Sequence, residues 1–548
     1  MTVTPEHLLI APILIPFFAG ALMLLYGDEK QRKARLTLSF GSAFALLLVA
    51  FELLERASQS PMAEGGAMGF YLLGDWAAPY GIVLVLDRLS AMMLLLVALL
   101  ALPALIYSLA GWQRQGQHFH ALFQFLLMGL NGAFLTGDLF NLFVFFEVLL
   151  AASYGLLLHG SGPVRARAGL HYIAVNLTAS LMFLIGVSLI YGVTGTLNMA
   201  HLTGLIPDLP EADRPLLHAG GAILALAFLV KAGMWPLSFW LPTAYMAGAP
   251  PVAAIFAILT KVGVYAVLRL SMLMFGPGAG PSVGVGAEVL MTGGMLTVLF
   301  GLLGVLGSQA LGRMAGHLVL ISSGTVLAVV GFALAGAGPA MLAGGLYYLM
   351  ASTLASSALF LLIEPMSRED GDIAAMLALT ADAYGIEDLQ EDEDAGASLA
   401  IPTSLAMLSL CFAGCLLVLS GMPPLAGFVG KVAILSGLLT DGGLSVSQDW
   451  SWIFMAVLLA SGLATLIGLV RVGVQVFWTT ESTAQRVWAL EVGPAVGLLL
   501  IVVAMTVRAE DVLRYMEATS RALHSPPVYT TGVGLAPRIS DQPPEDTP

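Results

Sequence analysis

The chain has 548 residues, of which 10% are charged and 58% are hydrophobic, and its formal net charge is −13. Soluble domains contain about 25% charged and about 45–50% apolar residues, so the composition excludes a soluble globular protein and indicates an integral membrane protein. The acidic residues lie largely outside the apolar segments, so the net charge says little about a substrate, and we expect no nucleic acid partner. The 61 glycines fit this class, because small residues let membrane helices pack closely.

The apolar segments are long enough for about fourteen membrane spans. A bilayer core requires about 20 apolar residues per helix, and such runs start near residues 8, 36, 82, 119, 139, 170, 217, 250, 285, 313, 340, 402, 453 and 489. The first run follows no basic segment and is long enough to remain as a span rather than be removed as a signal peptide. We therefore predict an all-α polytopic protein embedded in a lipid bilayer.

Lysine and arginine are distributed unequally between the two alternating sets of loops. Before the C-terminal tail, one set contains only Arg56, Arg214 and Arg269, whereas the other contains eleven cations. These eleven are Lys30, Arg32, Lys33, Arg35, Arg114, Arg165, Arg167, Arg313, Arg368, Arg471 and Arg486. The positive-inside rule places them in the cytoplasm. The N-terminus is then expected outside and, with an even number of spans, the C-terminus also.

Charged residues at the third and fifth spans differ in their expected roles. Arg88 follows Asp87 where the third span begins, and we predict that the two form an interfacial ion pair. Asp138 stands at the start of the fifth span, where a carboxylate is a common helix N-cap. Glu147 lies well inside that span, in "DLFNLFVFFEVLLAASY". A carboxylate at this depth needs a partner, since intramembrane acids usually pair with another charge or face a hydrated cavity.

The seventh span contains Lys231 in the stretch "FLVKAGMWPLSFWLP". A charged side chain at mid-membrane costs about 2.5–3.5 kcal/mol on the insertion scale, and Glu147 is the natural partner for this ammonium. Pro236 and Pro242 interrupt the helix, and irregular backbone at that depth is tolerated only where protein or a hydrated cavity satisfies it. Forming and breaking a Glu147–Lys231 pair would control the proton on Lys231. A static pair that fixes helix register is the alternative.

Further polar residues lie in the eighth, tenth and eleventh spans. Lys261 is the intramembrane cation of the eighth span and follows Thr260. A possible lining for a water path near Lys261 consists of Thr260, His317, Ser352, Thr353, Ser356 and Ser357. The alternatives are that the hydroxyls serve helix packing and that His317 is a neutral core histidine.

The twelfth span repeats the pattern of the seventh. In "LSGMPPLAGFVGKVAIL", Pro423 and Pro424 interrupt an apolar run and Lys431 follows. Broken spans at corresponding positions of two halves are typical of transporters that carry their sites near the midplane. The halves would be spans four to eight and nine to thirteen, although the residues alone leave open whether the halves are inverted.

The rest of the chain indicates no cofactor. Cys411 and Cys415 are too few for a metal site and are expected to pack within their span. Residues 364–400 contain eleven acids and the single cation Arg368, which indicates a solvated cytoplasmic loop or, alternatively, a docking segment for a companion protein. The tail from about Ser525 is rich in proline and is predicted to be disordered. No nucleotide motif, catalytic triad, metal site or iron–sulfur cysteine set is present.

Several motifs resemble the D subunits of the multisubunit Mrp or Pha type cation/proton antiporters. They are "TGDLFNLFVFFEVLLAASYGL", "YGVTGTLNMA", "VKAGMWPLSFWLPTAY", "PPVAAIFAILTKVGVYAVLR" and "LSGMPPLAGFVGK". Two others, "LGDWAAPYGIVLVLDRLSAMML" and "HFHALFQFLLMGLNGAFLTGD", look most like the potassium-associated Pha type. The resemblance covers about residues 8–510. The same superfamily includes the antiporter-like subunits of respiratory complex I.

The resemblance implies a fourteen-helix fold with two inverted five-helix repeats and breaks in helices seven and twelve. Residues 1–118 would form three N-terminal helices, 119–276 and 285–478 the repeats, 479–510 the last helix, and 511–548 a polar, partly disordered tail. By motif, the ion-translocating residues would be Glu147, Lys231, Lys261 and Lys431. The stretch "YYLMASTLASSALF" has no histidine or lysine where some relatives have one, so a relay there would need hydroxyls and water.

The main functional hypothesis is a secondary transporter subunit, not an enzyme, in a bacterial inner membrane. It would conduct protons in exchange for K⁺ or Na⁺, with companion subunits of the A, B, C, E, F and G types. The residues alone do not choose between the two cations. One alternative is a proton-pumping arm of a redox complex, for which neighbouring reading frames should encode cluster-binding proteins. Another is a static scaffold.

Overall fold

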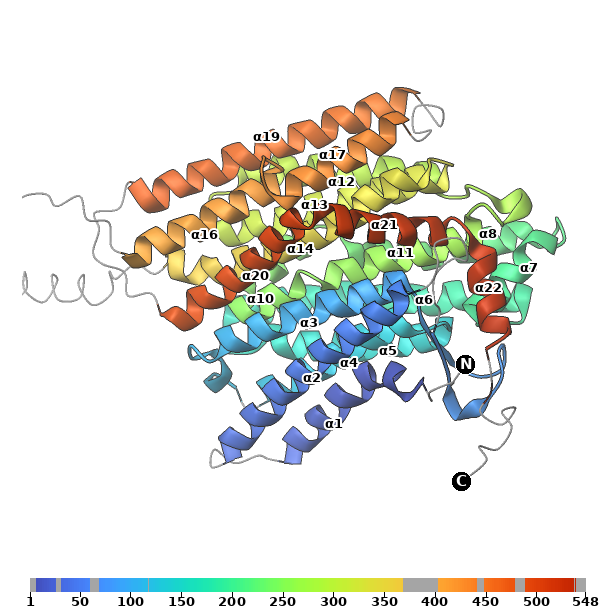
Figure 1. Cartoon of the computed structure of the whole chain (residues 1–548), viewed down its shortest axis with the longest axis horizontal. Coiled ribbons are helices and arrows are strands. Elements are labelled where there is room, and N and C mark those ends of the chain that lie inside the picture. Colours follow the sequence, from blue (N-terminus) through green and yellow to red (C-terminus); the bar gives the residue numbers. More distant parts are fainter. Residues whose placement is uncertain are drawn as a thin grey trace, which may run out of the picture.

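The computed structural model describes residues 6–25, 31–59, 69–116, 118–367, 403–440, 448–478, 488–536 and 538. The long helices run roughly parallel to one another (Figure 1). They are α1 (Ala11–Leu25), α2 (Arg32–Ser58), α3 (Arg88–Ser108), α4 (Phe119–Leu135), α5 (Leu139–Leu157), α6 (Pro163–Thr194), α8 (Arg214–Ala232), α11 (Leu259–Phe275), α12 (Ala287–Gly307), α13 (Leu311–Leu334), α14 (Pro339–Ser367), α16 (Thr403–Ser420), α17 (Ala426–Thr440), α19 (Gln448–Trp478) and α20 (Ala489–Val507). Most of the predicted acidic loop lies outside the described residues.

Shorter elements join these helices. They are α7 (Met199–Leu205), α9 (Leu241–Ala247), α10 (Pro250–Phe256), α21 (Ala509–Leu523), α22 (Pro526–Gly534) and the antiparallel strands β1 (Gly69–Leu72) and β2 (Val83–Leu86), in which Gly69 pairs with Leu86. The α8–α9, α10–α11 and α16–α17 pairs each occupy one span, because an interruption divides an apolar run of spanning length.

The prediction of about fourteen spans is confirmed. In the described part of the chain, eleven helical segments are long and apolar enough to cross a membrane. The short apolar helices α1 and α4 and the α16–α17 pair account for the other predicted spans. The breaks fall in spans seven and twelve, as expected. Each five-span unit crosses the membrane an odd number of times, so the second unit starts from the opposite side and is inverted.

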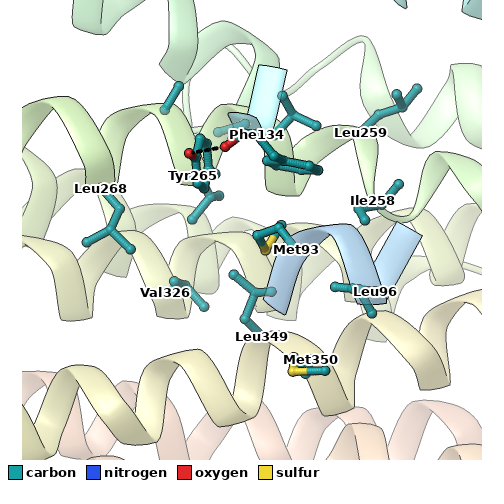
Figure 2. Close-up of a cluster of buried hydrophobic side chains, with 14 of the residues drawn as sticks. Met93, Leu96, Phe134, Ile258, Leu259, Tyr265, Leu268, Val326, Leu349 and Met350 are labelled. Atoms are coloured by element: carbon teal, nitrogen blue, oxygen red, sulfur yellow. Dashed lines mark hydrogen bonds between the residues drawn. The ribbon is translucent and has the colours of Figure 1, made fainter. Parts of the chain in front are cut away.

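The centre of the bundle is formed by α11, α13 and α14. In the most apolar 18-residue segment of Pro250–Phe275, 100% of the residues are buried. The corresponding segments of α13 and α14 are 94% buried, whereas that of α6 is 39% buried. Figure 2 shows Met93 of α3, Val326 of α13 and Leu349 of α14 gathered around α11. Helices α1, α2 and α19 lie at the edges of the bundle (Figure 1). Charged groups on α11 are therefore shielded from lipid by other helices.

Two helix starts are fixed by aspartate caps. The prediction for Asp138 is confirmed, because its Oδ1 accepts from the Asn141 backbone N–H at 2.8 Å at the start of α5. Asp87 caps α3 in the same way, accepting from the Ser90 N–H at 2.9 Å. Both caps satisfy an N–H that has no partner within its own helix.

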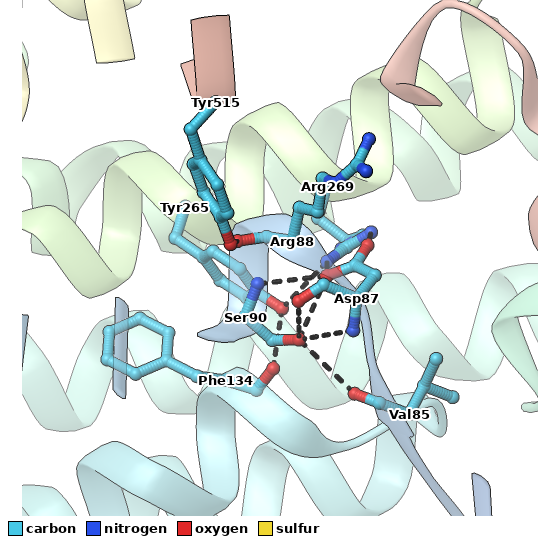
Figure 3. A network of polar contacts seen from close by, with 8 residues as sticks. All are labelled: Val85, Asp87, Arg88, Ser90, Phe134, Tyr265, Arg269 and Tyr515. Carbon is cyan, nitrogen blue, oxygen red and sulfur yellow. Dashed lines mark hydrogen bonds and ion pairs between the residues drawn. The ribbon is translucent and has the colours of Figure 1, made fainter. Parts of the chain in front are cut away.

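The predicted pair between Asp87 and Arg88 is wrong. Arg269 of α11 binds both carboxylate oxygens of Asp87, with Nη2 at 2.7 Å from Oδ1 and Nη1 bonded to Oδ2 (Figure 3). The Arg88 side chain is buried and its Nε donates to the Ala57 carbonyl. A planar guanidinium matches a carboxylate in this two-bond geometry, and packing of α11 near the start of α3 decides the pairing.

The prediction of disorder from Ser525 is wrong for residues 526–534. These residues form α22, which begins with Pro526 and buries Tyr529 and Val533. The Tyr529 ring lies 5.5 Å from the Arg269 guanidinium. On α21, the Tyr515 hydroxyl donates to the Arg88 carbonyl at 2.8 Å (Figure 3). Proline suits the first turn of a helix, and these aromatic contacts supply the tertiary packing that stabilises a short helix.

Candidate ion-translocation site

The break in span seven is a tight turn at the end of α8. Gly233 has a φ of +72°, and the Met234 N–H donates back to the Leu229 carbonyl at 2.9 Å. This is a Schellman cap, in which a left-handed glycine satisfies carbonyls at a helix end. The next N–H, of Trp235, donates to the Thr297 hydroxyl of α12 at 2.9 Å. Another helix therefore supplies a partner to the interrupted backbone.

Lys231 lies two residues before this turn and is buried, with 6% of its surface exposed. Its Nζ is 5.1 Å from the centroid of the Phe146 ring on α5, which places the ammonium in cation–π contact. Glu147 is the neighbour of this ring. Its Oε1 atom is buried and makes no hydrogen bond among the described residues. The direct Glu147–Lys231 ion pair that we expected is not formed between these described side chains, although Lys231 lies over the ring of the residue that precedes Glu147.

Lys261 on α11 is 1% exposed and is held by hydroxyl groups. Its Nζ donates to the Ser322 and Ser323 hydroxyls of α13 at 2.8 and 2.9 Å. The Ser322 hydroxyl lies 2.7 Å from the Ser352 hydroxyl of α14, which also donates to the Tyr348 carbonyl at 2.6 Å. A continuous row of hydrogen bonds thus crosses from α11 through α13 to α14.

Sequence reasoning missed Ser322 and Ser323. The signal was present, since two adjacent hydroxyls stand in the apolar run "HLVLISSGTVLAVV" of the tenth span. We predicted His317 instead, five residues earlier. The importance of the serines appears only when α13 packs against α11, because a sequence indicates the depth of a residue in the bilayer but not which neighbour it faces.

A close helix contact brings Lys231 and Lys261 onto adjacent surfaces. Gly263, two residues after Lys261, packs against the α8 backbone, where an added Cβ would lie 2.6 Å from the Ala232 nitrogen and 2.8 Å from the Phe228 carbonyl oxygen. Only glycine permits this approach. The contact lies beside the end of α8 that carries Lys231.

Span eight is itself interrupted just before Lys261. Helix α10 ends at Phe256 and α11 starts at Leu259, with short turns between them. The Tyr245 hydroxyl donates to the Phe256 carbonyl at 2.8 Å, and the Thr260 hydroxyl donates to the Ala257 carbonyl at 3.4 Å. Thr260 therefore serves the interruption locally. No glycine or proline marks this site, which explains why the sequence did not reveal it.

The break in span twelve has the same backbone turn. Gly421 has a φ of +75°, and the Met422 N–H donates to the Leu417 carbonyl at 2.9 Å. Lys431 follows the break on α17 and is 7% exposed. Its Nζ donates to the Ser420 carbonyl at 2.9 Å. The ammonium is thus bound by a backbone oxygen at the interruption itself.

The predicted helix-breaking prolines lie at the two breaks. Pro236, Pro423 and Pro424 are in the turns that follow α8 and α16, where they supply no backbone donor. Pro242 is instead the second residue of α9, a position that tolerates proline. It packs against α13, where a Cβ added to Gly316 would lie 2.7 Å from its Cα.

The remaining predicted residues occupy different surroundings. The His317 ring stacks on Phe300 of α12 with centroids 5.8 Å apart, and its Nδ1 donates to a carbonyl of its own helix. Thr353 likewise donates to its own helix at 2.6 Å. The hydroxyls of Ser356 and Ser357 are buried and have no hydrogen-bond partner in the described part of the chain. Within that part, only Ser352 of this set joins the Lys261 row.

Comparison with known sequences identifies the family. Residues 136–465 match the family described as NADH:quinone oxidoreductase/Mrp antiporter, TM. The chain is 52% identical over 547 residues to the D subunit of a probable K(+)/H(+) antiporter of Rhizobium meliloti, covering 99% of this chain and 100% of that protein. It is 32% identical to the D subunit of a Na(+)/H(+) antiporter of Alkalihalophilus pseudofirmus, covering 96% and 99% of the two chains.

Solved structures share the fold. A chain of the Mrp complex from Dietzia sp. DQ12-45-1b superposes with a TM-score of 0.78 at 25% identity, covering 97% of this chain and 100% of that one. A chain of respiratory complex I from Thermus thermophilus gives a TM-score of 0.72 at 22% identity, covering 95% and 99%. The chain therefore belongs to the NADH:quinone oxidoreductase/Mrp antiporter family of membrane proteins, among the D subunits of its multisubunit cation/proton antiporters.

Proposed function

We propose that this D-type antiporter subunit carries protons in exchange for K⁺, through a row of buried lysines. The observation that carries the proposal is the bonding of Lys261, whose ammonium is held by two serine hydroxyls. A hydroxyl both accepts and donates hydrogen bonds, so it can receive a proton from one side and release another on the opposite side. Since these partners are neutral, a proton leaves Lys261 without breaking an ion pair.

In the proposed relay, a proton enters near Glu147 and Lys231. The Oε1 of Glu147 is buried and has no hydrogen bond among the described residues, so it would attract the ammonium in this relay, while the Phe146 ring holds the ammonium in the present arrangement. Movement of Lys231 between these two partners changes whether its charge is balanced. The proton then passes to Lys261 across the close α8–α11 contact, with water completing the connection.

After Lys261, the proposed relay continues through α13 and α14. Ser322 and Ser352 extend the hydrogen bonds of Lys261 to α14. Tyr348, one turn before Ser352, packs against Gly430, where an added Cβ would lie 3.0 Å from the Tyr348 Cα. Gly430 directly precedes Lys431, so the row leads to the second broken helix. His317 faces α12, and the proposed path does not use it.

The choice of cation and the setting are part of the proposal. The 52% identity to a relative described as belonging to a probable K(+)/H(+) antiporter, against 32% to a Na(+)/H(+) one, supports K⁺. We place the chain in a bacterial inner membrane with companion antiporter subunits of the A, B, C, E, F and G types. The unequal distribution of lysine and arginine supports N- and C-termini outside.

The test is cation-driven proton exchange in everted vesicles that contain the full assembly. The expected result is exchange with K⁺ that exceeds exchange with Na⁺, and its loss in Lys231→Ala at unchanged subunit content. Because the substitution removes the buried ammonium, assembly without transport is the expected phenotype. Normal exchange in Lys231→Ala would overturn the relay, and equal or higher exchange with Na⁺ would overturn the choice of K⁺.

A further inference from the structure

An apolar cavity of about 370 Å³ lies between α8, α11 and α12. Its lining is almost entirely aliphatic or aromatic and includes Leu334 of α13. Along α8 its lining residues run from His218 to Leu229. Ala222 and Val289 at its rim are exposed on the side of the bundle, Val289 to 58%. The cavity therefore opens at the surface of helices that are long and apolar enough to span a membrane.

The length of this lining along α8 matches one leaflet of a membrane. From His218 to Phe228 the helix advances ten residues, or about 15 Å at 1.5 Å per residue. Half of a hydrocarbon core of about 30 Å is also about 15 Å. The lower end reaches Phe228 and Met234, on either side of Lys231 in the sequence. An extended acyl chain in this cavity would run from the interface to the level of the broken helix.

Polar groups gather at the opposite end, where α8 begins. The buried Ser282 hydroxyl accepts from Arg214 Nη1 at 3.3 Å and lies 3.0 Å from His218 Nε2. Arg214 Nη2 donates to the Pro207 carbonyl at 3.1 Å. These bonds use two of the five guanidinium N–H groups, and Arg214 forms no ion pair with any carboxylate among the described residues. Arg214 thus has no ion pair among the described residues and lies one helical turn before His218, which lines the cavity.

We propose that this cavity binds one phospholipid of the surrounding bilayer. Its phosphate is bound by Arg214 and His218, through the charge-assisted hydrogen bonds that guanidinium groups form with phosphate, and one acyl chain fills the space along α8 to Phe228. Asp208, Glu211 and Asp213 make the adjoining loop acidic and weaken the binding of any phosphate, so burial of an acyl chain is what favours a lipid over a free phosphate. Only a lipid also gains from burying an apolar chain.

The lipid would have a consequence for transport that rests on the proposed function. The Phe228 ring at the end of the cavity lies 5.5 Å from the Phe146 ring, which is the ring beneath the Lys231 ammonium. An acyl chain packed on Phe228 would restrict the position of both rings. It would thereby stabilise the surroundings of Lys231 from the lipid side.

The binding claim is tested by counting lipids, without any transport measurement. The intact antiporter assembly is purified in detergent, and the phospholipid retained per complex is measured by mass spectrometry. Ala225→Trp fills the cavity, and Arg214→Gln removes the phosphate-binding cation. Ala219→Trp is the matched control, because Ala219 is exposed on the same helix and does not line the cavity. The expected result is one fewer retained phospholipid in both test variants than in the wild type and Ala219→Trp.

Three outcomes would overturn the proposal. They are equal phospholipid counts in all four proteins, loss in Ala219→Trp as large as in Ala225→Trp, and recovery of a phosphate-free molecule such as a quinone from the wild type in place of the lipid. If Ala225→Trp does not assemble, the surface change Arg214→Gln still decides the question. If the lipid counts contradict the binding site, the proposed relay is unaffected. If the relay fails in the transport assay but the two test variants still lose a phospholipid, the binding site stands.

Discussion

At the first broken helix, α8 ends in a left-handed Gly233, and at the second, α16 ends in a left-handed Gly421. In both turns the following methionine donates to a carbonyl five residues back, at 2.9 Å. The two lysines are held differently. Lys231 precedes its turn and lies over an aromatic ring beside a carboxylate, whereas Lys431 follows its turn and binds the Ser420 carbonyl.

The difference separates the shared architecture from the chemistry. The glycine turn interrupts the helix at corresponding places in both repeats, as in transporters whose sites lie at broken helices. At the second break, a fixed carbonyl dipole positions the ammonium and holds no proton of its own. At the first break, the ionisable side chain of Glu147 follows the Phe146 ring in the sequence, so the proposed relay gives the lysine a second ionisable partner there. We infer that the first break controls proton entry and the second receives the proton.

The Asp87–Arg269 pair is a third kind of buried charge. Its two side chains are joined by two hydrogen bonds, and the Arg269 guanidinium lies 5.4 Å and 5.5 Å from the Tyr265 and Tyr529 rings (Figure 3 shows Tyr265). Separating such a pair leaves an uncompensated buried charge and costs about 3–5 kcal/mol. This pair is suited to holding α3, α11 and α22 together rather than to carrying ions.

Among the variants that compare the two breaks, the largest effect is expected from Lys431→Arg at the second break. A guanidinium can still donate to the Ser420 carbonyl but does not release a proton in proteins. If Lys431 receives and releases protons, cation-driven exchange in everted vesicles should fall by about tenfold or more, which is about 1.4 kcal/mol or more in the barrier. Subunit content should be unchanged. Exchange at the wild-type rate in Lys431→Arg would contradict this prediction. Lys431 would then serve only as a hydrogen-bond donor, and the second break would lie outside the proton relay.

An intermediate effect is expected from Ser352→Ala, which cuts the hydroxyl row between the two breaks. Loss of one hydrogen bond worth about 1 kcal/mol should lower exchange about fivefold. Thr353→Val is the matched control, because the Thr353 hydroxyl bonds to its own helix. Exchange rates are compared in the same vesicle assay. If both substitutions lowered exchange equally, the Lys261–Ser322–Ser352 row would have no special role.

The smallest effect on the exchange rate is expected from alanine at the two turn glycines, where the main cost falls on stability. An L-residue in the left-handed conformation costs roughly 1–2 kcal/mol, so Gly233→Ala and Gly421→Ala should lower the thermal stability of the assembly similarly. Their transport effects should differ. A Cβ at residue 421 would lie 2.5 Å from the Lys431 Cδ, whereas at residue 233 it would meet Leu320 and Leu241. Greater loss of exchange in Gly233→Ala would contradict the assigned lysine positions.

Much of the fold could be predicted from the sequence, because membrane spans and their breaks leave strong local signals. Apolar runs indicated the spans, and glycine and proline near Lys231 and Lys431 marked both interruptions. The pairing of charges could not be predicted in the same way. Asp87 pairs with Arg269, 182 residues away, and not with its neighbour Arg88. Such pairings depend on which helix faces pack against one another, and helix packing cannot be predicted from a single sequence.

The candidate site shows the same limit. The buried lysines stood out because charges are rare in apolar runs. Ser322 and Ser323 did not, because serine is common in membrane helices and its role depends on its neighbour. The interruption before Lys261 also lacks a glycine or proline signal. Packing of Tyr245 and α11 stabilises it, and packing is a property of the folded chain.

The most direct test of the proposed relay is the exchange rate of the intact assembly with Glu147→Gln. This substitution keeps the size of the side chain and removes the titratable partner that distinguishes the first break from the second. The relay predicts loss of cation-driven proton exchange in everted vesicles, with every subunit present at the wild-type level. Exchange at the wild-type rate would contradict it, because the protonation of Lys231 would then not depend on that carboxylate.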